Sequence, residues 1–275
     1  HPVNLAYEAA TADLNDVNMI DPYHLEAYGE TTVNYNRDVE IFPVLNTIFE
    51  KIYGESPYKS PTDMGVNMAG NCICDDEVCR EASCQEIIRR YYAALNSLAK
   101  GDSSDKEAQK IELLMNMAGI STTDRKVAVK ALERAKETEG PAAALELEDG
   151  RIVTGKTTNL LGASAALLLN VLKELAGIDH DLHIISPESI EPIQKLKVDY
   201  LKSKNPRLHT DEVLIALSAS AAVNPNARLA LSQLPKLDGC QAHTSVMLSD
   251  VDIKIFKKLG VQLTCEAVYE HILLS

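Results

Sequence analysis

The chain has 275 residues, of which 45% are apolar and 24% charged, as in a folded globular protein. Its 27 Lys and Arg residues against 40 Asp and Glu residues give a formal net charge of −13, which disfavours binding to nucleic acid. No apolar run approaches the roughly 20 residues that a membrane-spanning helix needs. We therefore expect a cytoplasmic protein with neither nucleic acid nor membrane as a partner. It begins at His1 without a signal peptide, so we expect a part of a longer protein.

The first half is expected to consist of helices and polar loops. Apolar residues at helical spacing predict helices over 37–53, 75–100, 106–117 and 124–138. Gly140-Pro141 combines a helix stop with a residue that cannot continue a helix. It predicts a boundary between a helical region, 1–140, and a second region, 141–275.

The second half alternates strands and helices. Asp149-Gly150 between two short alternating runs predicts a β-hairpin over 144–154. Next we expect a buried helix over 160–175, a strand over 183–185 and a helix over 211–223 capped by Thr210. A strand over 244–248, a helix over 249–259 that begins at Ser249 and a last strand over 261–267 follow. Apolar helices of this kind pack on a sheet, so we expect an α/β fold, or α+β over the whole chain, with a layered α/β/α subdomain.

Residues Gly150–Thr157 match the pattern G-x-x-x-x-G-K-[ST] of ATP-binding P-loops. A P-loop needs a strand before its first glycine and an open loop between its two glycines. Here the first glycine is a hairpin turn, and the residues between the glycines read as a strand whose amides bond across the hairpin. We interpret the match as false.

Four cysteines gather at Cys72, Cys74, Cys79 and Cys84, and thiolates suit zinc and iron–sulfur clusters. The last two fall on the predicted helix 75–100. Five residues along a helix turn a side chain by about 500°, so the two sulfurs diverge by roughly 140°. We expect reduced thiols and no metal.

The hairpin followed by a buried helix resembles the opening of the cytidine-deaminase-like fold. Such deaminases hold zinc with a Cys or His near a Glu at that helix start and with two Cys at the next. This chain has Leu160–Ser164 at the first place and Asn205–His209 at the second, so ligands and glutamate are missing. A shared topology would not imply shared chemistry.

Three segments could carry a site. Arg207 and His209 lie just before a predicted helix, where Arg207 suits a carboxylate or phosphate and His209 suits acid–base chemistry. The alternative is a capped helix start with a solvated Arg207 and a packed His209. The polar loops 28–38 and 60–67 contribute Asn34, Arg37, Asp63 and Asn67, residue types that serve either a site or ordinary turns.

At these segments the chain resembles a bacterial family named domain of unknown function 1846, or uncharacterised protein family 0371. The resemblance lies in residues 1–14, 28–38, 60–68, 85–92 and 205–209 and points to the C-terminal portion of the family. It implies that an N-terminal α/β region with its own Gly-rich, P-loop-like stretch precedes His1. It also implies a helical region followed by a deaminase-like subdomain. It carries over no catalytic residue and indicates no cofactor.

Two functions from different classes follow. The first is the C-terminal part of an enzyme acting on a nucleotide or another phosphorylated small molecule. His209 and Asp63 would be catalytic, and Asn34, Arg37, Asn67 and Arg207 would bind substrate, while the preceding region would bind phosphate. The second is a non-catalytic binding or oligomerisation module, for which a homo-oligomer is the expected state.

Overall fold

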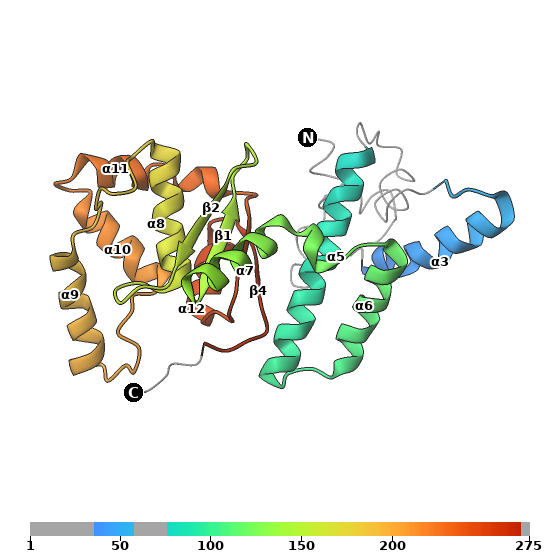
Figure 1. Cartoon of the computed structure of the whole chain (residues 1–275), viewed down its shortest axis with the longest axis horizontal. Helices are drawn as coiled ribbons and strands as arrows, with labels where there is room; N and C mark the ends of the chain where they lie inside the picture. Colours follow the sequence, from blue (N-terminus) through green and yellow to red (C-terminus); the bar gives the residue numbers. More distant parts are fainter. Residues whose placement is uncertain (1–35, 58–75, 271–275) are drawn as a thin grey trace, which may run out of the picture. The chain divides into compact units, whose positions relative to one another are not determined.

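The computed structural model describes residues 36–57 and 76–270, and the chain forms two compact units (Figure 1). The first unit comprises His1–Ala94 and Ser103–Asp124, and the second comprises Leu95–Asp102 and Arg125–Ser275. Helix α7 (Lys126–Thr138) falls in the second unit because it packs against the sheet of that unit. The division between the two units therefore lies before α7, whereas the predicted boundary at Gly140-Pro141 lies after the end of α7.

The first unit is helical. Helices α3 (Asn36–Tyr53), α5 (Asp76–Lys100) and α6 (Asp105–Ala118) agree with the expected helices, and α5 runs on into the second unit beyond Ala94. Gly119 ends α6 with a left-handed φ of 67°, a conformation that glycine adopts without strain. A short 3-10 turn, η1 (Thr122–Asp124), follows. None of the helices in the described part of the chain is long and apolar enough to cross a membrane.

The second unit is a mixed α/β structure built on a four-stranded sheet in the order β2-β1-β3-β4. Strands β1 (Ala142–Glu146) and β2 (Ile152–Lys156) form the predicted antiparallel hairpin. Strand β3 (Gln241–Thr244) is antiparallel to β1, and β4 (Gln262–Cys265) is parallel to β3. The sheet thus joins a local hairpin to strands from the far end of the chain.

Helices cover both faces of this sheet (Figure 1). Because side chains alternate along a strand, Ala144 of β1 packs with Val127 and Ala131 of α7, while its neighbour Leu145 faces the main core. Helix α8 (Ala163–Ala176) contributes most to that core. The other helices that contribute residues to this core are α9 (Pro187–Lys195), α10 (Thr210–Ser220), α11 (Pro225–Leu231) and α12 (Asp250–Lys258). Two short turns complete the unit, η2 (Leu196–Tyr200) and η3 (Leu234–Leu237).

Arg125 ties α7 to the sheet. It is 1% exposed, its Nε donates to Thr264 Oγ1 at 2.9 Å, and its Nη2 donates to the carbonyls of Ala242 and Gln262 at 2.9 and 2.8 Å. These bonds satisfy a buried charge with groups of β3 and β4. They explain why α7 belongs with the sheet.

The Gly150–Thr157 segment is a hairpin and not a phosphate-binding loop, as its sequence context indicates. Gly150 occupies the turn with φ 81°, and its amide donates to Leu147 O at 2.9 Å. Gly155 pairs with Ala143 within the β1–β2 ladder. A Cβ at Gly155 would overlap the backbone of Leu167 in α8. The second glycine of the pattern is therefore required by strand-to-helix packing.

Two strand predictions differ from the structure. Residues 183–185 form no strand, and Ile184 and Ile185 instead insert into the main core from the irregular segment between α8 and α9. The strand predicted over 244–248 lies at Gln241–Thr244, and the chain leaves the sheet after Thr244, whose Oγ1 donates to Val246 O at 2.7 Å. Short apolar runs do not reveal which of their residues pair, because pairing depends on a distant strand.

The cysteine cluster is only partly within the described residues. Cys84 lies on α5, the side chain of Cys79 is not described, and Cys72 and Cys74 lie outside the described ranges. Within those ranges, no group of three or more His, Cys, Asp or Glu residues could hold a metal ion.

We expect Gly155→Ala to lower the free energy of unfolding by roughly 3 kcal/mol, because a methyl group there collides with the α8 backbone. Urea denaturation measures the loss. Gly150→Ala is the matched control, since nothing lies within 4 Å of its Cβ position and its only cost is about 1–2 kcal/mol of left-handed strain. An equal or smaller loss at Gly155 would contradict the close approach of β2 to α8.

Candidate functional site

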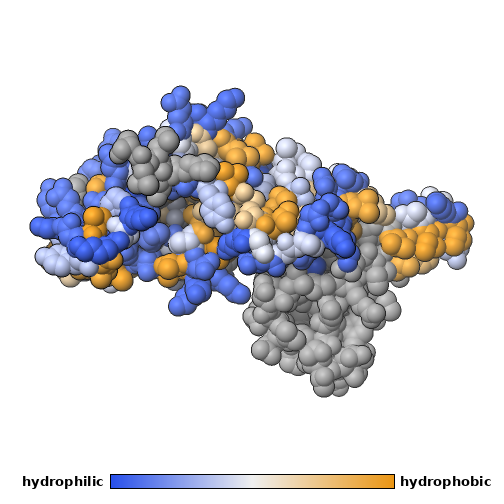
Figure 2. All heavy atoms as spheres, turned by 90° about the horizontal axis from the view of Figure 1, so that it is seen from below, coloured by the Kyte–Doolittle hydropathy of each residue, from blue (hydrophilic) through white to orange (hydrophobic). Residues whose placement is uncertain are grey.

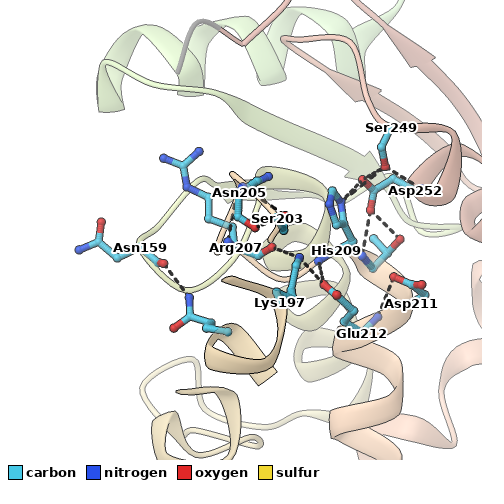
Figure 3. A network of polar contacts seen from close by, with 12 residues as sticks. Asn159, Lys197, Ser203, Asn205, Arg207, His209, Asp211, Glu212, Ser249 and Asp252 are labelled. Atoms are coloured by element: carbon cyan, nitrogen blue, oxygen red, sulfur yellow. Dashed lines mark hydrogen bonds and ion pairs between the residues drawn. The ribbon is translucent and has the colours of Figure 1, made fainter. Parts of the chain in front are cut away.

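The N-termini of α10 and α12 meet at the carboxylate of Asp252 (Figure 3). Leu208 precedes α10, is 1% exposed and forms a bridge with Leu161 ahead of α8, which fixes the entry into α10. His209 is the N-cap residue of α10, and Ser249 is the N-cap residue of α12. The sequence predicted the cap at Ser249 correctly, whereas the cap of α10 is His209 and not Thr210.

Asp252 accepts hydrogen bonds from three residues. Oδ1 accepts from the backbone N of Thr210 at 2.9 Å and from its Oγ1 at 2.8 Å. Oδ2 accepts from Ser249 Oγ at 2.7 Å and lies 3.0 Å from His209 Nδ1. The Asp252 side chain is 5% exposed, so these bonds replace the water that a buried carboxylate loses.

The bonds set the charge state of both groups. Burial by itself raises the pKa of Asp252, but the hydrogen bonds from His209, Thr210 and Ser249 outweigh burial and lower the pKa to about 2. The hydrogen bond with Asp252 raises the pKa of His209 above its usual value, against a smaller opposing effect of burial. The pair is therefore an ionised carboxylate that favours the protonated imidazole.

The remaining ring nitrogen of His209 is available. The side chain is 31% exposed, and Nε2 makes no hydrogen bond to any residue that the structure describes. Ser249 lies on the other side of the ring, with its Oγ 3.5 Å from Nδ1 of His209. This hydroxyl donates a hydrogen bond to Asp252 Oδ2. A serine nucleophile would instead lie at Nε2. The arrangement suits proton transfer or anion binding at Nε2 and not a Ser–His–Asp triad.

Lys197 and Glu212 hold the backbone of His209. Lys197 lies in the π-helical turn η2, is 7% exposed at its side chain, and its Nζ donates to Glu212 Oε2 at 2.7 Å and to Arg207 O at 2.6 Å. The same Glu212 oxygen accepts from the backbone N of His209 at 2.8 Å. Single π-helical turns often mark functional sites. Here the turn supports the residues on either side of Leu208.

Arg207 is partly exposed and pairs with the C-terminal segment. Its Nη1 donates to Glu270 Oε1, and the two side chains are 28% and 29% exposed. Figure 3 shows the Arg207 side chain pointing away from the imidazole of His209. The surrounding segment is basic in an acidic protein, with one acidic residue, Asp199, among Lys195, Lys197, Lys202, Lys204 and Arg207. Lys195, Lys202 and Lys204 of this segment are exposed, whereas Lys197 is buried.

His243 has a different role from His209. It is completely buried on β3, its Nδ1 lies 2.8 Å from Thr264 Oγ1, and its Nε2 lies 3.3 Å from Glu266 Oε1. Burial lowers its pKa, in contrast to the raised pKa of His209. His243 is a core residue.

The structure describes only some of the sequence-predicted residues. Arg207 and His209 lie two residues apart on one described segment. Arg37 is in α3, which begins at Asn36, so it belongs to a helix and its side chain is not described. The candidates Asn34, Asp63 and Asn67 lie outside the described residues. Which of these side chains come together with His209 remains a prediction.

Sequence reasoning missed Asp252, Lys197, Glu212 and Glu270 as neighbours of Arg207 and His209. Ser249 and Asp252 were read only as the start of a helix. Asp252 and His209 are 43 residues apart, and Glu270 and Arg207 are 63 apart. Glu212 carried a weak signal, since a Glu three residues after a helix cap is typical of a capping box.

Two family models match the chain. The model described as "Domain of unknown function DUF1846, N-terminal" matches residues 1–119, and the model described as "Domain of unknown function DUF1846, C-terminal" matches residues 123–274. Neither description names an activity. The expectation that only the C-terminal portion is present was wrong, because the N-terminal model matches as well.

The chain is also similar to UPF0371 proteins. It is 61% identical to one of Corynebacterium urealyticum over 269 residues and 61% identical to one of Corynebacterium efficiens over 271 residues. It is 56% identical to one of Streptococcus pneumoniae over 271 residues. Each alignment covers 98% of this chain and 54% or 55% of the relative, so the chain spans about half the length of these relatives. The chain thus belongs to the DUF1846 family, with residues of both its N-terminal and its C-terminal domain.

Proposed function

We propose that the second unit carries the proton-transfer and anion-binding centre of a cytoplasmic enzyme that acts on a nucleotide or another phosphorylated small molecule. The observation that carries the proposal is the hydrogen bond between the ionised Asp252 and Nδ1 of His209, which leaves Nε2 available. A buried carboxylate that orients an imidazole and favours its charged form is the usual way to prepare a histidine for acid–base chemistry.

The charge around His209 supports a phosphorylated substrate. A protonated imidazole donates a hydrogen bond from Nε2 to an anionic oxygen and can also transfer that proton to a leaving group. Arg207 would bind a phosphate or carboxylate group, and the exposed Lys202 and Lys204 would attract it. Lys197 takes no part in binding, because it is buried against Glu212.

The predicted roles of the first unit complete the proposal. Asp63 would be a second catalytic group, and Asn34, Arg37 and Asn67 would bind substrate from the polar segments of that unit. The relatives are about twice as long as this chain, and we propose that the rest of the full-length protein includes a Gly-rich phosphate-binding stretch. The hairpin at Gly150 does not supply one.

A non-catalytic assembly module is the second candidate, and one observation favours it. Val44, Ile48 and Ile52 follow one face of α3 and are 53%, 44% and 64% exposed, and Figure 2 shows apolar side chains gathered along this helix. Such a face is typical of a helix that contacts another protein, and a homo-oligomer would cover it. Ligand binding that depends on His209 favours the enzyme, whereas self-association without ligand binding favours the module.

We also infer that the second unit shares the topology of the cytidine-deaminase-like fold without its zinc chemistry. Support comes from the β1–β2 hairpin before the buried α8 and from the parallel pair β3 and β4 joined through α12. Leu160–Ser164 and Asn205–His209, where deaminases place their ligands, include no Cys and no Glu. Protein produced with added zinc and then desalted should contain well below one zinc per chain by mass spectrometry. Stoichiometric zinc would overturn this inference.

We expect His209→Asn to weaken binding of phosphorylated ligands by tenfold or more, roughly the contribution of one charged hydrogen bond. Asn Nδ2 can still donate to Asp252, so the free energy of unfolding should change by less than about 1 kcal/mol. His209→Ala removes both interactions and should lose stability as well as binding. Nucleotides and sugar phosphates would be screened by thermal shift, and affinities measured by calorimetry. Equal affinity of His209→Asn and the parent protein would refute the role of His209.

We expect Asp252→Asn to lower the pKa of His209, because the ionised carboxylate is the main cause of its elevation. The raised pKa of His209 adds stability below its usual value of 6.5, which is lost as the pH rises through the pKa of the folded protein. The lowered pKa of Asp252 adds about 2 kcal/mol above 3.8, which is lost as the pH falls towards 2. The loss of unfolding free energy caused by Asp252→Asn should therefore be greatest between pH 3.8 and pH 6.5.

An NMR titration of the imidazole protons would measure the pKa of His209, and urea denaturation at several pH values would measure stability. Asp250→Asn is the matched control, because Asp250 lies in the same helical turn with a side chain that is 78% exposed. An unchanged His209 pKa in Asp252→Asn would contradict the assigned pairing.

A further inference from the structure

We propose that Glu270 is a resident carboxylate that occupies the anion-binding position of Arg207, and that a phosphorylated ligand must displace it. This inference rests on the proposed function, since it concerns how the same segment would bind its ligand. It adds a regulatory contact between the C-terminal segment and the residues that precede α10.

The Arg207–Glu270 pair is the exchangeable ion pair around this segment. Both its side chains are more than a quarter exposed, at 28% and 29%. The Lys197–Glu212 and His209–Asp252 pairs, by contrast, each contain one buried partner, since Lys197 and Asp252 are 7% and 5% exposed at their side chains and are held by several hydrogen bonds. Separating a buried pair leaves an uncompensated charge, whereas a partly exposed pair separates at small cost because water solvates both groups. A ligand would therefore replace a partner at Arg207 first.

The segment that carries Glu270 can move without loss of the sheet. Its backbone is held at Glu266, whose N donates to Thr244 O at 2.9 Å, and at Val268, whose O accepts from Met247 N at 2.8 Å. Beyond Val268, the side chain of Tyr269 is 54% exposed. Arg207 is the only residue of the described part of the chain that bonds to Glu270. Release of Glu270 would break one ion pair and no strand pairing.

A phosphate group fits the position that the carboxylate would leave. A guanidinium donates parallel hydrogen bonds to carboxylate and phosphate oxygens in the same planar geometry. A phosphate carries more charge than a carboxylate, and the exposed Lys202 and Lys204 lie on the same basic segment. Glu270 therefore competes with the ligand, and the strength of its ion pair reduces the apparent affinity of the ligand.

The test is a titration with inorganic phosphate, followed by NMR, of the 275-residue chain and its variants at low ionic strength. Glu270→Gln should bind phosphate roughly fivefold more tightly than the parent, the upper range for a partly exposed ion pair. Arg207→Gln in the Glu270→Gln background should remove this gain. Glu133→Gln is the matched control, since Glu133 forms an exposed ion pair with Lys130 on α7 and should leave phosphate affinity unchanged.

Three results would overturn the proposal. They are equal phosphate affinity in Glu270→Gln and the parent, a gain that persists without Arg207, and no phosphate binding by either protein. Failure of the proposed function is measured separately through His209→Asn. If that variant loses phosphate binding while Glu270→Gln matches the parent, the displacement is wrong and the role of His209 stands. If Glu270→Gln gains affinity while His209→Asn does not lose it, the displacement stands and the role of His209 is wrong.

Discussion

The buried carboxylate of Asp252 is the interaction on which the candidate site depends. It accepts hydrogen bonds at the N-terminus of α10 while it lies in the first turn of α12 (Figure 3). Helix N-termini carry unsatisfied amides and partial positive charge, so one anion stabilises both helices at once. The pKa of about 2 means that this anion persists throughout the physiological range. The orientation and charge of His209 follow from it.

Two ion pairs near this carboxylate, Lys197–Glu212 and Arg207–Glu270, differ in whether they include a buried charge. This difference gives them different roles. Lys197 is buried, and its hydrogen bonds to Glu212 and to Arg207 O make it a fixed support for the backbone of His209. Arg207 and Glu270 are exposed enough to change partners. A rigid support beside an exchangeable contact is what a binding site requires, because the first limits the loss of conformational entropy and the second admits a ligand.

Local signals predicted much of the fold correctly. Asp149-Gly150 placed the hairpin, and a strand context was enough to reject the P-loop pattern at Gly150–Thr157. The pattern Ser249 with Asp252 placed the start of α12. The strand predicted at 183–185 was wrong, because two adjacent apolar residues enter a core equally well from an irregular segment. At the candidate site, Arg207 and His209 were singled out by residue type without their partners, and their roles stay a prediction.

The sequence by itself determined the hairpin, the start of α12, most of the helices and the family, because each depends on residues within a few positions or on long matching segments. It did not predict α9 or α11, and it placed the cap of α10 at Thr210 instead of His209. Only the tertiary structure decided that Asp252 lies against His209, that Glu270 lies against Arg207 and that α7 belongs with the sheet. These pairings join residues far apart in the chain, and no local preference encodes which distant carboxylate a histidine will meet. The same residue type therefore has a raised pKa at His209, next to Asp252, and a lowered pKa at His243, which is buried. Burial and partners, which the tertiary structure determines, set the charge of each histidine.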